Sequence, residues 1–182
     1  MHTTPTTDVI DALKARIRHV PDFPKPGILF YDITTLLRDP EGFKLAIDTL
    51  VAPYNREDID MVVGIESRGF ILGAAVADRL RAGFVPVRKV GKLPSKTVRV
   101  SYDLEYGSDS LEMHSDAIVN GCRVLLVDDL LATGGTAAAT VKLIKQLGGK
   151  IHAVSFLIEL TFLNGRAKLA GEETHVVLKY DD

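Results

Sequence analysis

The chain has 182 residues, of which 46% are hydrophobic and 25% are charged, the balance of a globular protein rather than a disordered one. Its 22 Lys and Arg residues stand against 24 Asp and Glu residues, and the net charge of -2 excludes a globally basic nucleic-acid binder. The single cysteine, Cys122, excludes an intrachain disulfide and a Cys-rich metal cluster, and it indicates a reducing, intracellular setting.

The first residues contain neither a basic start nor an apolar run of signal-peptide length. The longest stretch without charged residues, Leu130 to Val141, contains Gly and Thr and is too short for a membrane span, which needs roughly 20 apolar residues. We therefore expect one cytoplasmic domain over residues 1–182, with no membrane and no nucleic acid among its partners.

Apolar periodicity and chain breakers predict the elements in chain order. A helix is expected over 8–19, a proline-rich extended loop over 21–27 and a second helix over 41–54. Short apolar runs then alternate with helical patterns, which predicts strands at 61–65, 84–88, 123–127, 151–158 and 176–180 and helices at 69–81 and 135–147. This alternation is typical of an α/β fold with a parallel sheet covered on both faces.

Residues 91–115 interrupt this alternation with a polar segment of short alternating stretches. The pattern predicts a mobile insertion with the character of a hairpin, which we call the lid. Charge is segregated around it: seven basic residues and no acids run from Arg79 to Tyr102, and five acids with no Lys or Arg run from Asp103 to Cys122. A basic run of this kind is either a solvated face or a binding surface for a highly charged anion.

The strongest chemical signal is the segment 124–136, where a buried strand ends in two carboxylates and a small-residue loop opens a helix. Backbone N–H groups at a helix start favour a phosphate, and Gly134 and Gly135 allow it to approach closely. Asp128 and Asp129 accept hydrogen bonds when ionised, which suits the vicinal hydroxyls of a ribose. The expected ligand is a ribose 5-phosphate; the alternative is a capped turn with two solvated aspartates.

This segment resembles the signature of the type I phosphoribosyltransferases, which use 5-phosphoribosyl 1-pyrophosphate with Mg²⁺ to place a phosphoribosyl group on a nitrogenous base. The resemblance implies an open, mostly parallel sheet flanked by helices, a flexible lid and a small N-terminal segment, the hood. It assigns the ribose hydroxyls to Asp128 and Asp129. It also implies a homodimer and Mg²⁺ held mainly by the substrate, without direct protein ligands. The 5-phosphate is assigned to the loop residues Ala132, Thr133, Gly134, Gly135 and Thr136.

Further segments resemble adenine-specific members of the same family, in the expected order: 23–34, 66–70, 88–94, 101–107 and 158–161. The resemblance places the base contact in the hood, about residues 17–40, at Leu29, Phe30 and Tyr31, with the Phe30 ring stacked on the purine. A backbone C=O followed two residues later by an N–H matches the amino group and N1 of adenine and leaves a 6-oxopurine unpaired. Some relatives carry Arg at the position of Tyr31, and Phe30 is alternatively a plain core aromatic.

The remaining assignments concern the pyrophosphate and the lid. A helix start together with Arg68 suits pyrophosphate, and some family members have a cis peptide in the matching loop. The resemblance makes Glu105 the catalytic carboxylate that takes up the N9 proton of adenine, with Tyr106 beside it in the closing lid. The residues expected to bind pyrophosphate are Ser67, Arg68, Arg88, Lys89 and Lys92.

The resulting prediction is an enzyme that transfers the 5-phosphoribosyl group to adenine and releases AMP and pyrophosphate. One alternative is a phosphoribosyltransferase for another base, such as a 6-oxopurine, xanthine or orotate. A second is a non-catalytic ligand-sensing module. Repressors of that kind carry an extra DNA-binding domain, and the roughly 20 residues before Pro21 are too few for one.

Overall fold

The structure, a computed structural model, describes residues 5–103 and 108–181. The chain divides into two compact units, Met1–Pro53 and Tyr54–Asp182. Across the described residues, no helix combines the length and the apolar character that crossing a membrane requires.

The first unit combines helices with a short antiparallel strand pair. Its core consists of apolar side chains from the helices and from the segments that join them. These buried residues include Leu13, Ile33, Leu36, Ile47 and Leu50. The elements are α1 (Thr7–Lys14), β1 (Arg18–Val20), β2 (Phe30–Asp32), α2 (Thr34–Arg38) and α3 (Pro40–Val51).

The helix predicted over 8–19 is wrong over its last five residues, because α1 ends at Lys14 and the chain then enters β1. β1 pairs with β2 in antiparallel register, with Arg18 opposite Asp32. The Arg18 guanidinium binds Asp32 Oδ2 through Nη2 at 2.5 Å and through Nε at 3.0 Å. This long-range pair lowers the pKa of Asp32 to about 2, chiefly through the hydrogen bond from Arg18.

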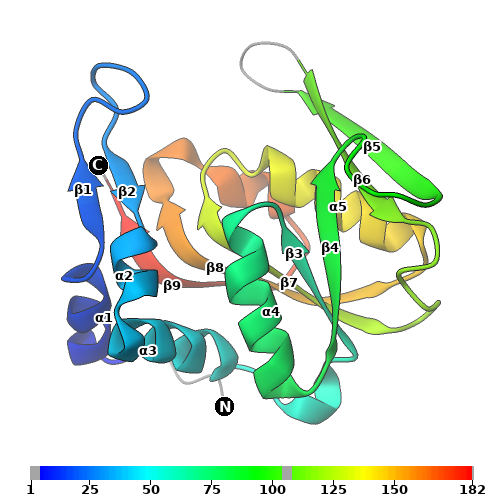
Figure 1. Cartoon of the computed structure of the whole chain (residues 1–182), viewed down its shortest axis with the longest axis horizontal. Coiled ribbons are helices and arrows are strands. Elements are labelled where there is room, and N and C mark those ends of the chain that lie inside the picture. Colours follow the sequence, from blue (N-terminus) through cyan, green and yellow to red (C-terminus); the bar gives the residue numbers. More distant parts are fainter. Residues whose placement is uncertain (1–4, 104–107, 182) are drawn as a thin grey trace. The chain divides into compact units, whose positions relative to one another are not determined.

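The second unit is built on a seven-stranded sheet in the order β5-β6-β4-β3-β7-β8-β9 (Figure 1). The central pairs are parallel, whereas β5 and β6 form an antiparallel hairpin that joins the sheet beside β4. This antiparallel strand pair lies within the segment predicted to be the lid, and it extends the main sheet. The strands are β3 (Met61–Ile65), β4 (Gly83–Lys89), β5 (Thr97–Asp103), β6 (Ser108–His114), β7 (Arg123–Leu131), β8 (Lys150–Leu160) and β9 (Thr174–Tyr180).

Two helices, α4 (Arg68–Leu80) and α5 (Gly135–Gln146), cover opposite faces of this sheet (Figure 1). Val63 and Ile65 share a buried core with side chains of α5. Gly64, which points the other way on the pleated strand, faces α4, because a Cβ there would lie 2.8 Å from Gly69 O. The predicted helix-covered α/β sheet is confirmed. Short 3₁₀ turns complete the unit: η1 (Arg56–Asp58), η2 (Thr161–Leu163) and η3 (Gly165–Leu169).

The chain leaves β3 and β7, which are neighbours, in opposite directions. From β3 it passes through α4 to β4 on one side, and from β7 through α5 to β8 on the other. The β3–β7 ladder runs as far as Gly64 opposite Val127, while β7 continues along β8 to Leu131. The strand predicted over 123–127 is therefore too short. In open α/β sheets, such a divergence of connections opens a crevice where ligands bind.

Candidate active site

The acid pair consists of consecutive residues of β7 beside the first turn of α4. Asp128 Oδ1 accepts the Asp129 N–H at 2.9 Å, and Asp129 Oδ2 accepts Arg68 Nε at 2.5 Å. A Cβ at Gly69 would come within 2.6 Å of Asp128 Oδ1, so a glycine lets the start of α4 pack against this carboxylate. Burial, followed by the adjacent charge of Asp129, raises the pKa of Asp128 well above its usual range. Asp128 therefore keeps its proton to a higher pH than an exposed aspartate.

The predicted phosphate loop, residues 132–136, joins β7 to α5. Residues 130–137 and Asp128 line one small cavity, so the loop and one carboxylate of the acid pair meet there. The first N–H groups of a helix have no partner within the helix, and the helix dipole adds partial positive charge at that end. The first turn of α5 contains no acidic residue that would oppose an anion. The cavity consequently suits a phosphate group.

Two glycines shape this loop, and only one of them was predicted. Gly134 caps α5 with a φ of +76°, and a Cβ there would lie 2.3 Å from Gly165 O. A Cβ at Gly165 would in turn lie 2.2 Å from Ala132 O. The turn around Gly165 is held by Arg166, whose Nε donates to Glu159 Oε1 at 2.7 Å. In the sequence, Gly165 is an isolated glycine shortly after segment 158–161. Local pattern could not link it to the loop, because the contact joins segments that are far apart in the chain.

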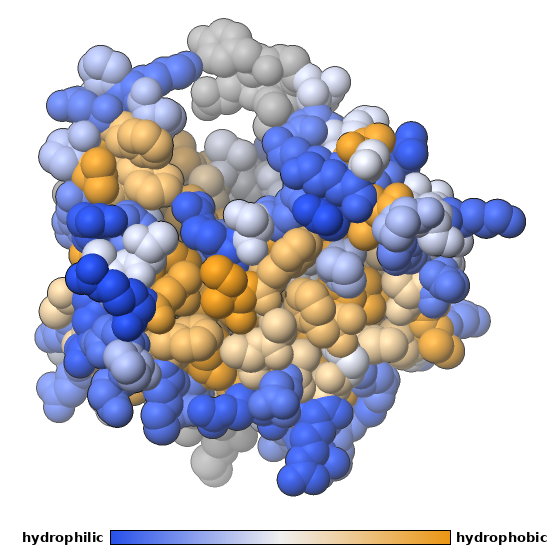
Figure 2. All heavy atoms as spheres, viewed as in Figure 1, coloured by the Kyte–Doolittle hydropathy of each residue, from blue (hydrophilic) through white to orange (hydrophobic). Residues whose placement is uncertain are grey.

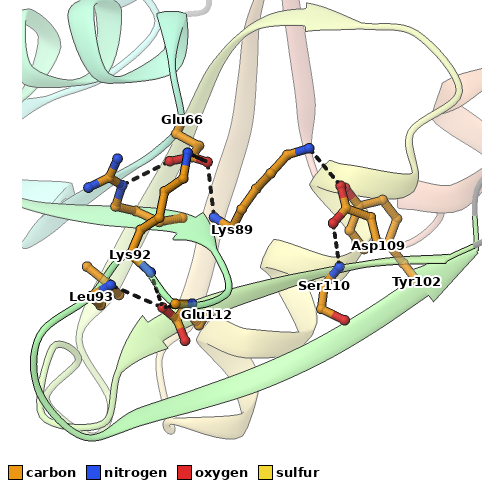
Figure 3. Close-up of polar contacts among 10 residues, drawn as sticks. Glu66, Lys89, Lys92, Leu93, Tyr102, Asp109, Ser110 and Glu112 are labelled. Atoms are coloured by element: carbon orange, nitrogen blue, oxygen red, sulfur yellow. Dashed lines mark hydrogen bonds and ion pairs between the residues drawn. The ribbon is translucent and has the colours of Figure 1, made fainter.

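Glu66, which follows β3, binds two of the predicted pyrophosphate cations, Arg88 and Lys92, and the main chain of the third, Lys89 (Figure 3). This carboxylate accepts Arg88 Nε at 2.9 Å, Lys92 Nζ at 3.1 Å and the Lys89 N–H at 3.2 Å. Burial alone would raise the pKa of Glu66, but the hydrogen bonds from Arg88 and Lys92 outweigh it and lower the pKa. We call Glu66, Arg88, Lys89 and Lys92 the basic cluster. Glu66 itself was not predicted as part of the site.

A chain of polar contacts links the basic cluster to the phosphate loop. Lys89 Nζ lies 3.0 Å from Asp109 Oδ2, and this pairing raises the pKa of Lys89. Tyr102 Oη donates to Asp109 Oδ2 and accepts from Thr136 Oγ1, both at 3.4 Å. Figure 3 shows Lys89 and Tyr102 converging on Asp109 from the neighbouring strands. The β5–β6 hairpin therefore contacts both ends of the candidate site.

The other two predicted pyrophosphate residues lie at the start of α4. Ser67 is the exposed N-cap residue, and its peptide bond with Glu66 is cis. Arg68 donates to Asp129 of the acid pair, as described above.

The predicted base-binding residues lie in the first unit. Tyr31 is buried, with its ring edge-on to His19 at 5.1 Å. Phe30 is only partly buried, and its ring lies edge-on to Phe23, also at 5.1 Å. Leu29 is 37% exposed. Tyr31 is therefore the core aromatic of this segment, whereas Phe30 is partly exposed.

Two predicted residues, Glu105 and Tyr106, lie outside the described residues. Within the described ranges, no group of three or more His, Cys, Asp or Glu side chains is placed to hold a metal ion. The acid pair alone would supply fewer ligands than a protein-built magnesium site needs.

The acid pair and the phosphate loop lie at the carboxyl end of β7 in a mostly parallel sheet, where the connections that leave β3 and β7 pass to opposite sides. This arrangement is typical of α/β proteins that bind a ligand at the carboxyl ends of their strands. The sequence pattern of the phosphoribosyl transferase domain matches residues 34–177, which is most of the chain. The chain therefore belongs to the phosphoribosyltransferase family.

Individual relatives narrow the class. The chain is 60% identical over 172 residues to an adenine phosphoribosyltransferase of Acidobacterium capsulatum, covering 94% of this chain and 95% of that one. The crystal structure of adenine phosphoribosyltransferase from Rhodothermus marinus is 55% identical with a TM-score of 0.91, covering 96% of this chain and 100% of that chain. The enzyme from Saccharomyces cerevisiae, solved with an imino-altritol bisphosphate and adenine, is 39% identical with a TM-score of 0.87, covering 95% and 100%.

Within its class, the chain belongs to the adenine phosphoribosyltransferases, enzymes that transfer the phosphoribosyl group from 5-phosphoribosyl 1-pyrophosphate to adenine and give AMP. The adenine-specific prediction is confirmed at the level of the family. The alternatives, a different base or a non-catalytic sensing module, find no support among these relatives.

Proposed function

We propose that this chain converts adenine and 5-phosphoribosyl 1-pyrophosphate into AMP and pyrophosphate, with the donor bound at the carboxyl ends of β3 and β7. The observation that carries the proposal is the cavity that Asp128 shares with the loop at the start of α5. An anion loop and the Asp128 carboxylate at one cavity, with Asp129 next to Asp128 in the chain, match the 5-phosphate and the ribose hydroxyls of one ligand.

In this proposal, the N–H groups of residues 132–136 and the hydroxyls of Thr133 and Thr136 bind the 5-phosphate. Asp129 accepts hydrogen bonds from the ribose, and Asp128 does so once it is ionised. Arg68 Nε, at 2.5 Å from Asp129 Oδ2, offsets part of the negative charge of the acid pair. The ribose is thereby held with its reacting carbon between the acid pair and the basic cluster.

The pyrophosphate of the donor is assigned to Arg88, Lys89 and Lys92, with Ser67 and the start of α4 beside them. A pyrophosphate carries more charge than one carboxylate, so it competes with Glu66 and Asp109 for these cations. Mg²⁺ would be held through the phosphates of the donor rather than by dedicated protein ligands, because this ion keeps several waters and is commonly bound in this way. Bound there, it would supply neutralisation of the charge on the leaving pyrophosphate.

The transfer forms a bond between adenine N9 and the ribose C1 and breaks the bond from C1 to pyrophosphate, which leaves with the bonding electrons. The N9 proton passes to Glu105, directly or by relay. Adenine is recognised by the main chain at Leu29 and Tyr31 and is stacked on the Phe30 ring. Residues 1–182 are proposed to be a single phosphoribosyltransferase domain. Support for the single domain comes from the family match, which spans residues of both units.

We also propose a homodimer in the cytoplasm. Helix α4 exposes Ile71 to 46%, and hydrophobic surface covers this helix in Figure 2. Exposed apolar patches of this kind are common at protein–protein interfaces. Light scattering coupled to gel filtration tests the dimer: a mass of twice 19.8 kDa supports it, and a mass of 19.8 kDa at micromolar concentration contradicts it.

A base panel tests the activity. The purified protein is incubated with Mg²⁺, the donor and one of adenine, hypoxanthine, guanine or orotate, and the nucleotide product is separated by chromatography. We expect AMP from adenine and at least about a hundredfold less product from a 6-oxopurine, because the latter leaves buried polar groups unpaired. Absence of AMP would refute the proposal, whatever else formed.

Two variants separate chemistry from donor binding. Glu105→Gln is expected to lower kcat about a hundredfold, with little change in the KM of the donor, because proton uptake contributes about 10²–10⁴ in rate. The double variant Asp128→Asn with Asp129→Asn is expected to raise the donor KM about tenfold or more, since each amide replaces an acceptor by a donor. An equal change of kcat and KM in Glu105→Gln would reassign this residue to binding.

A further inference from the structure

The segment 90–96 joins two strands that run in the same direction with another strand between them. β4 and β5 both pair antiparallel with β6, so they are parallel to each other. A connection between parallel strands usually takes a dozen or more residues and contains a helix. The connection over residues 90–96 is much shorter than a dozen residues, and it contains neither a helix nor a strand. Their N–H groups therefore need partners from side chains or water.

Glu112, on β6, supplies partners for three successive N–H groups of this crossing. Its Oε1 accepts the N–H of Gly91 at 2.9 Å and those of Lys92 and Leu93 at 3.1 Å each. Figure 3 shows the Glu112 carboxylate meeting the main chain beside Lys92 and Leu93. One carboxylate oxygen thus defines the course of the main chain through residues 91–93.

The second oxygen of Glu112 is also occupied. Oε2 accepts Thr97 Oγ1 and Arg99 Nε, each at 3.2 Å. The residue is 1% exposed, and a buried carboxylate without such donors would be strongly unfavourable. Burial alone would raise the pKa of Glu112, but the hydrogen bonds, first that from the Leu93 N–H, outweigh it and lower the pKa. The group is therefore ionised at neutral pH, with full acceptor capacity.

The segment that Glu112 holds carries a member of the basic cluster. Lys92 is bound twice, through its N–H by Glu112 and through Nζ by Glu66 at 3.1 Å. Glu112 also lies directly opposite Arg88 in the β4–β6 ladder. From one position on β6, Glu112 therefore contacts the segment 90–96 and pairs with the end of β4. These two parts of the chain carry Arg88, Lys89 and Lys92.

We propose that Glu112 is a positioning residue for pyrophosphate binding. It holds the main chain of residues 91–93 so that the Lys92 side chain reaches Glu66, beside the other cations of the basic cluster. The inference rests on the proposed function, because that function assigns pyrophosphate to this cluster. Glu112 acts through Lys92 and has no contact with substrate in this account. Its loss should consequently weaken pyrophosphate binding and leave the 5-phosphate end of the site intact.

The test compares two ligands of the same protein by isothermal titration calorimetry. Magnesium pyrophosphate reports on the basic cluster, and AMP reports on the phosphate loop and the ribose contacts. Glu112→Gln is expected to weaken magnesium pyrophosphate about tenfold and AMP less than about twofold, because a less preorganised segment binds more weakly. Similar losses for both ligands, or no loss for pyrophosphate, would overturn the inference.

A matched control uses another carboxylate that binds main chain and an arginine. Asp60 Oδ2 accepts the Arg123 N–H at 2.7 Å, and its Oδ1 accepts Arg123 Nη2 at 2.7 Å, at the start of β3 away from the carboxyl ends of the strands. Asp60→Asn is expected to change both affinities less than about twofold, even where it lowers the unfolding midpoint. A selective loss of pyrophosphate affinity in this variant would show that the readout follows stability, which would overturn the inference.

A double-mutant cycle separates positioning from a general structural role. If Glu112 acts through Lys92, Glu112→Gln should cause less than about a twofold further loss of pyrophosphate affinity in a Lys92→Met background. Fully additive losses would refute the inference. Should Glu112→Gln not fold, Thr97→Val removes one donor to Oε2 and is expected to weaken pyrophosphate about threefold with AMP unchanged; equal effects on both ligands would contradict it.

Wild-type protein keeps this inference distinct from the function on which it rests. If the wild type makes no AMP and binds no magnesium pyrophosphate, the proposed function fails. If the wild type does both and Glu112→Gln binds pyrophosphate equally well, the function stands and the positioning role alone is refuted.

Discussion

The phosphate loop and the basic cluster, which are the two ends of the candidate site, are built from different chemical groups. The phosphate loop relies on main chain: glycines at 134 and 165 let two backbone segments touch, and the start of α5 supplies N–H groups. The basic cluster relies on long side chains: Arg88 and Lys92 share the carboxylate of Glu66, while Lys89 pairs with Asp109.

The difference follows from charge and flexibility. Backbone N–H groups need no counter-charge, and their positions are fixed by the fold. Neighbouring Lys and Arg side chains repel one another and lose much conformational entropy when they are ordered, so the carboxylates of Glu66 and Asp109 stabilise their arrangement. Anion binding at the basic cluster should therefore depend more on charge and on neighbouring carboxylates than anion binding at the phosphate loop.

The largest effect is expected from a single methyl group in the phosphate loop. Gly134→Ala places a Cβ 2.3 Å from Gly165 O at a φ of +76°, so the loop must move. We expect about a hundredfold loss of kcat/KM for the donor, the effect of misplacing a binding group by about 1 Å. Steady-state kinetics at saturating adenine measure this loss.

Gly171→Ala is the control, because the φ of Gly171 is +91° but no atom lies within 4 Å of the added Cβ. It should cost about 1 kcal/mol of stability and leave kcat/KM unchanged; equal loss in both variants would reduce the effect to backbone strain.

A smaller effect is expected from pH on the carboxylate that organises the second region. The folded-state pKa of Glu112 lies below its ordinary value of 4.5, so its stabilisation is present above pH 4.5 and is lost as the pH falls through the lowered value. Wild type should exceed Glu112→Gln in unfolding free energy by about 2 kcal/mol at pH 7. Urea unfolding between pH 7 and pH 3 should show this difference shrinking toward zero on acidification. A difference that stays constant with pH would contradict the assignment.

Salt should distinguish the two regions more gently. Between about 0.05 and 0.5 M NaCl, magnesium pyrophosphate affinity is expected to fall about tenfold and AMP affinity about twofold, because mobile ions screen exposed Lys and Arg more than oriented backbone groups. Calorimetric titrations of the wild type at both salt concentrations measure the two slopes. Equal slopes would mean that side-chain charge matters as much at the phosphate loop as at the basic cluster.

The smallest effect is expected from the ion pair between Lys89 and Asp109. Both side chains are partly exposed, by 59% and 25%, and pairs of this kind contribute little to stability. Asp109→Asn should lower the unfolding free energy by less than about 0.5 kcal/mol in urea titrations. A loss above about 2 kcal/mol would mean that this pair is part of the structural core rather than an exchangeable contact.

Local patterns in the sequence were sufficient where the interacting residues are close in the chain. The acid pair, the glycine loop and the start of α5 occupy residues 128–136, so an apolar strand pattern followed by small residues predicts their proximity directly. The same holds for the alternation of β3, α4 and β4, because each element has its own periodicity. The clustering of Arg88, Lys89 and Lys92 also follows from their spacing.

Only the tertiary structure decided the features that depend on pairing between distant segments. β1 replaced the end of a predicted helix because Arg18 reaches Asp32, and β7 outlasted its apolar run because β8 continues beside it. Glu66 and Glu112 joined the site because neighbouring strands bring them to the cations. Short apolar runs and isolated acids carry no information on their distant partners, whereas burial makes those partners obligatory once the sheet has formed. The sequence by itself thus predicted the class of ligand, a ribose 5-phosphate. The fold determined that the carboxylates of Glu66 and Glu112 contact the basic cluster and the segment that carries Lys92.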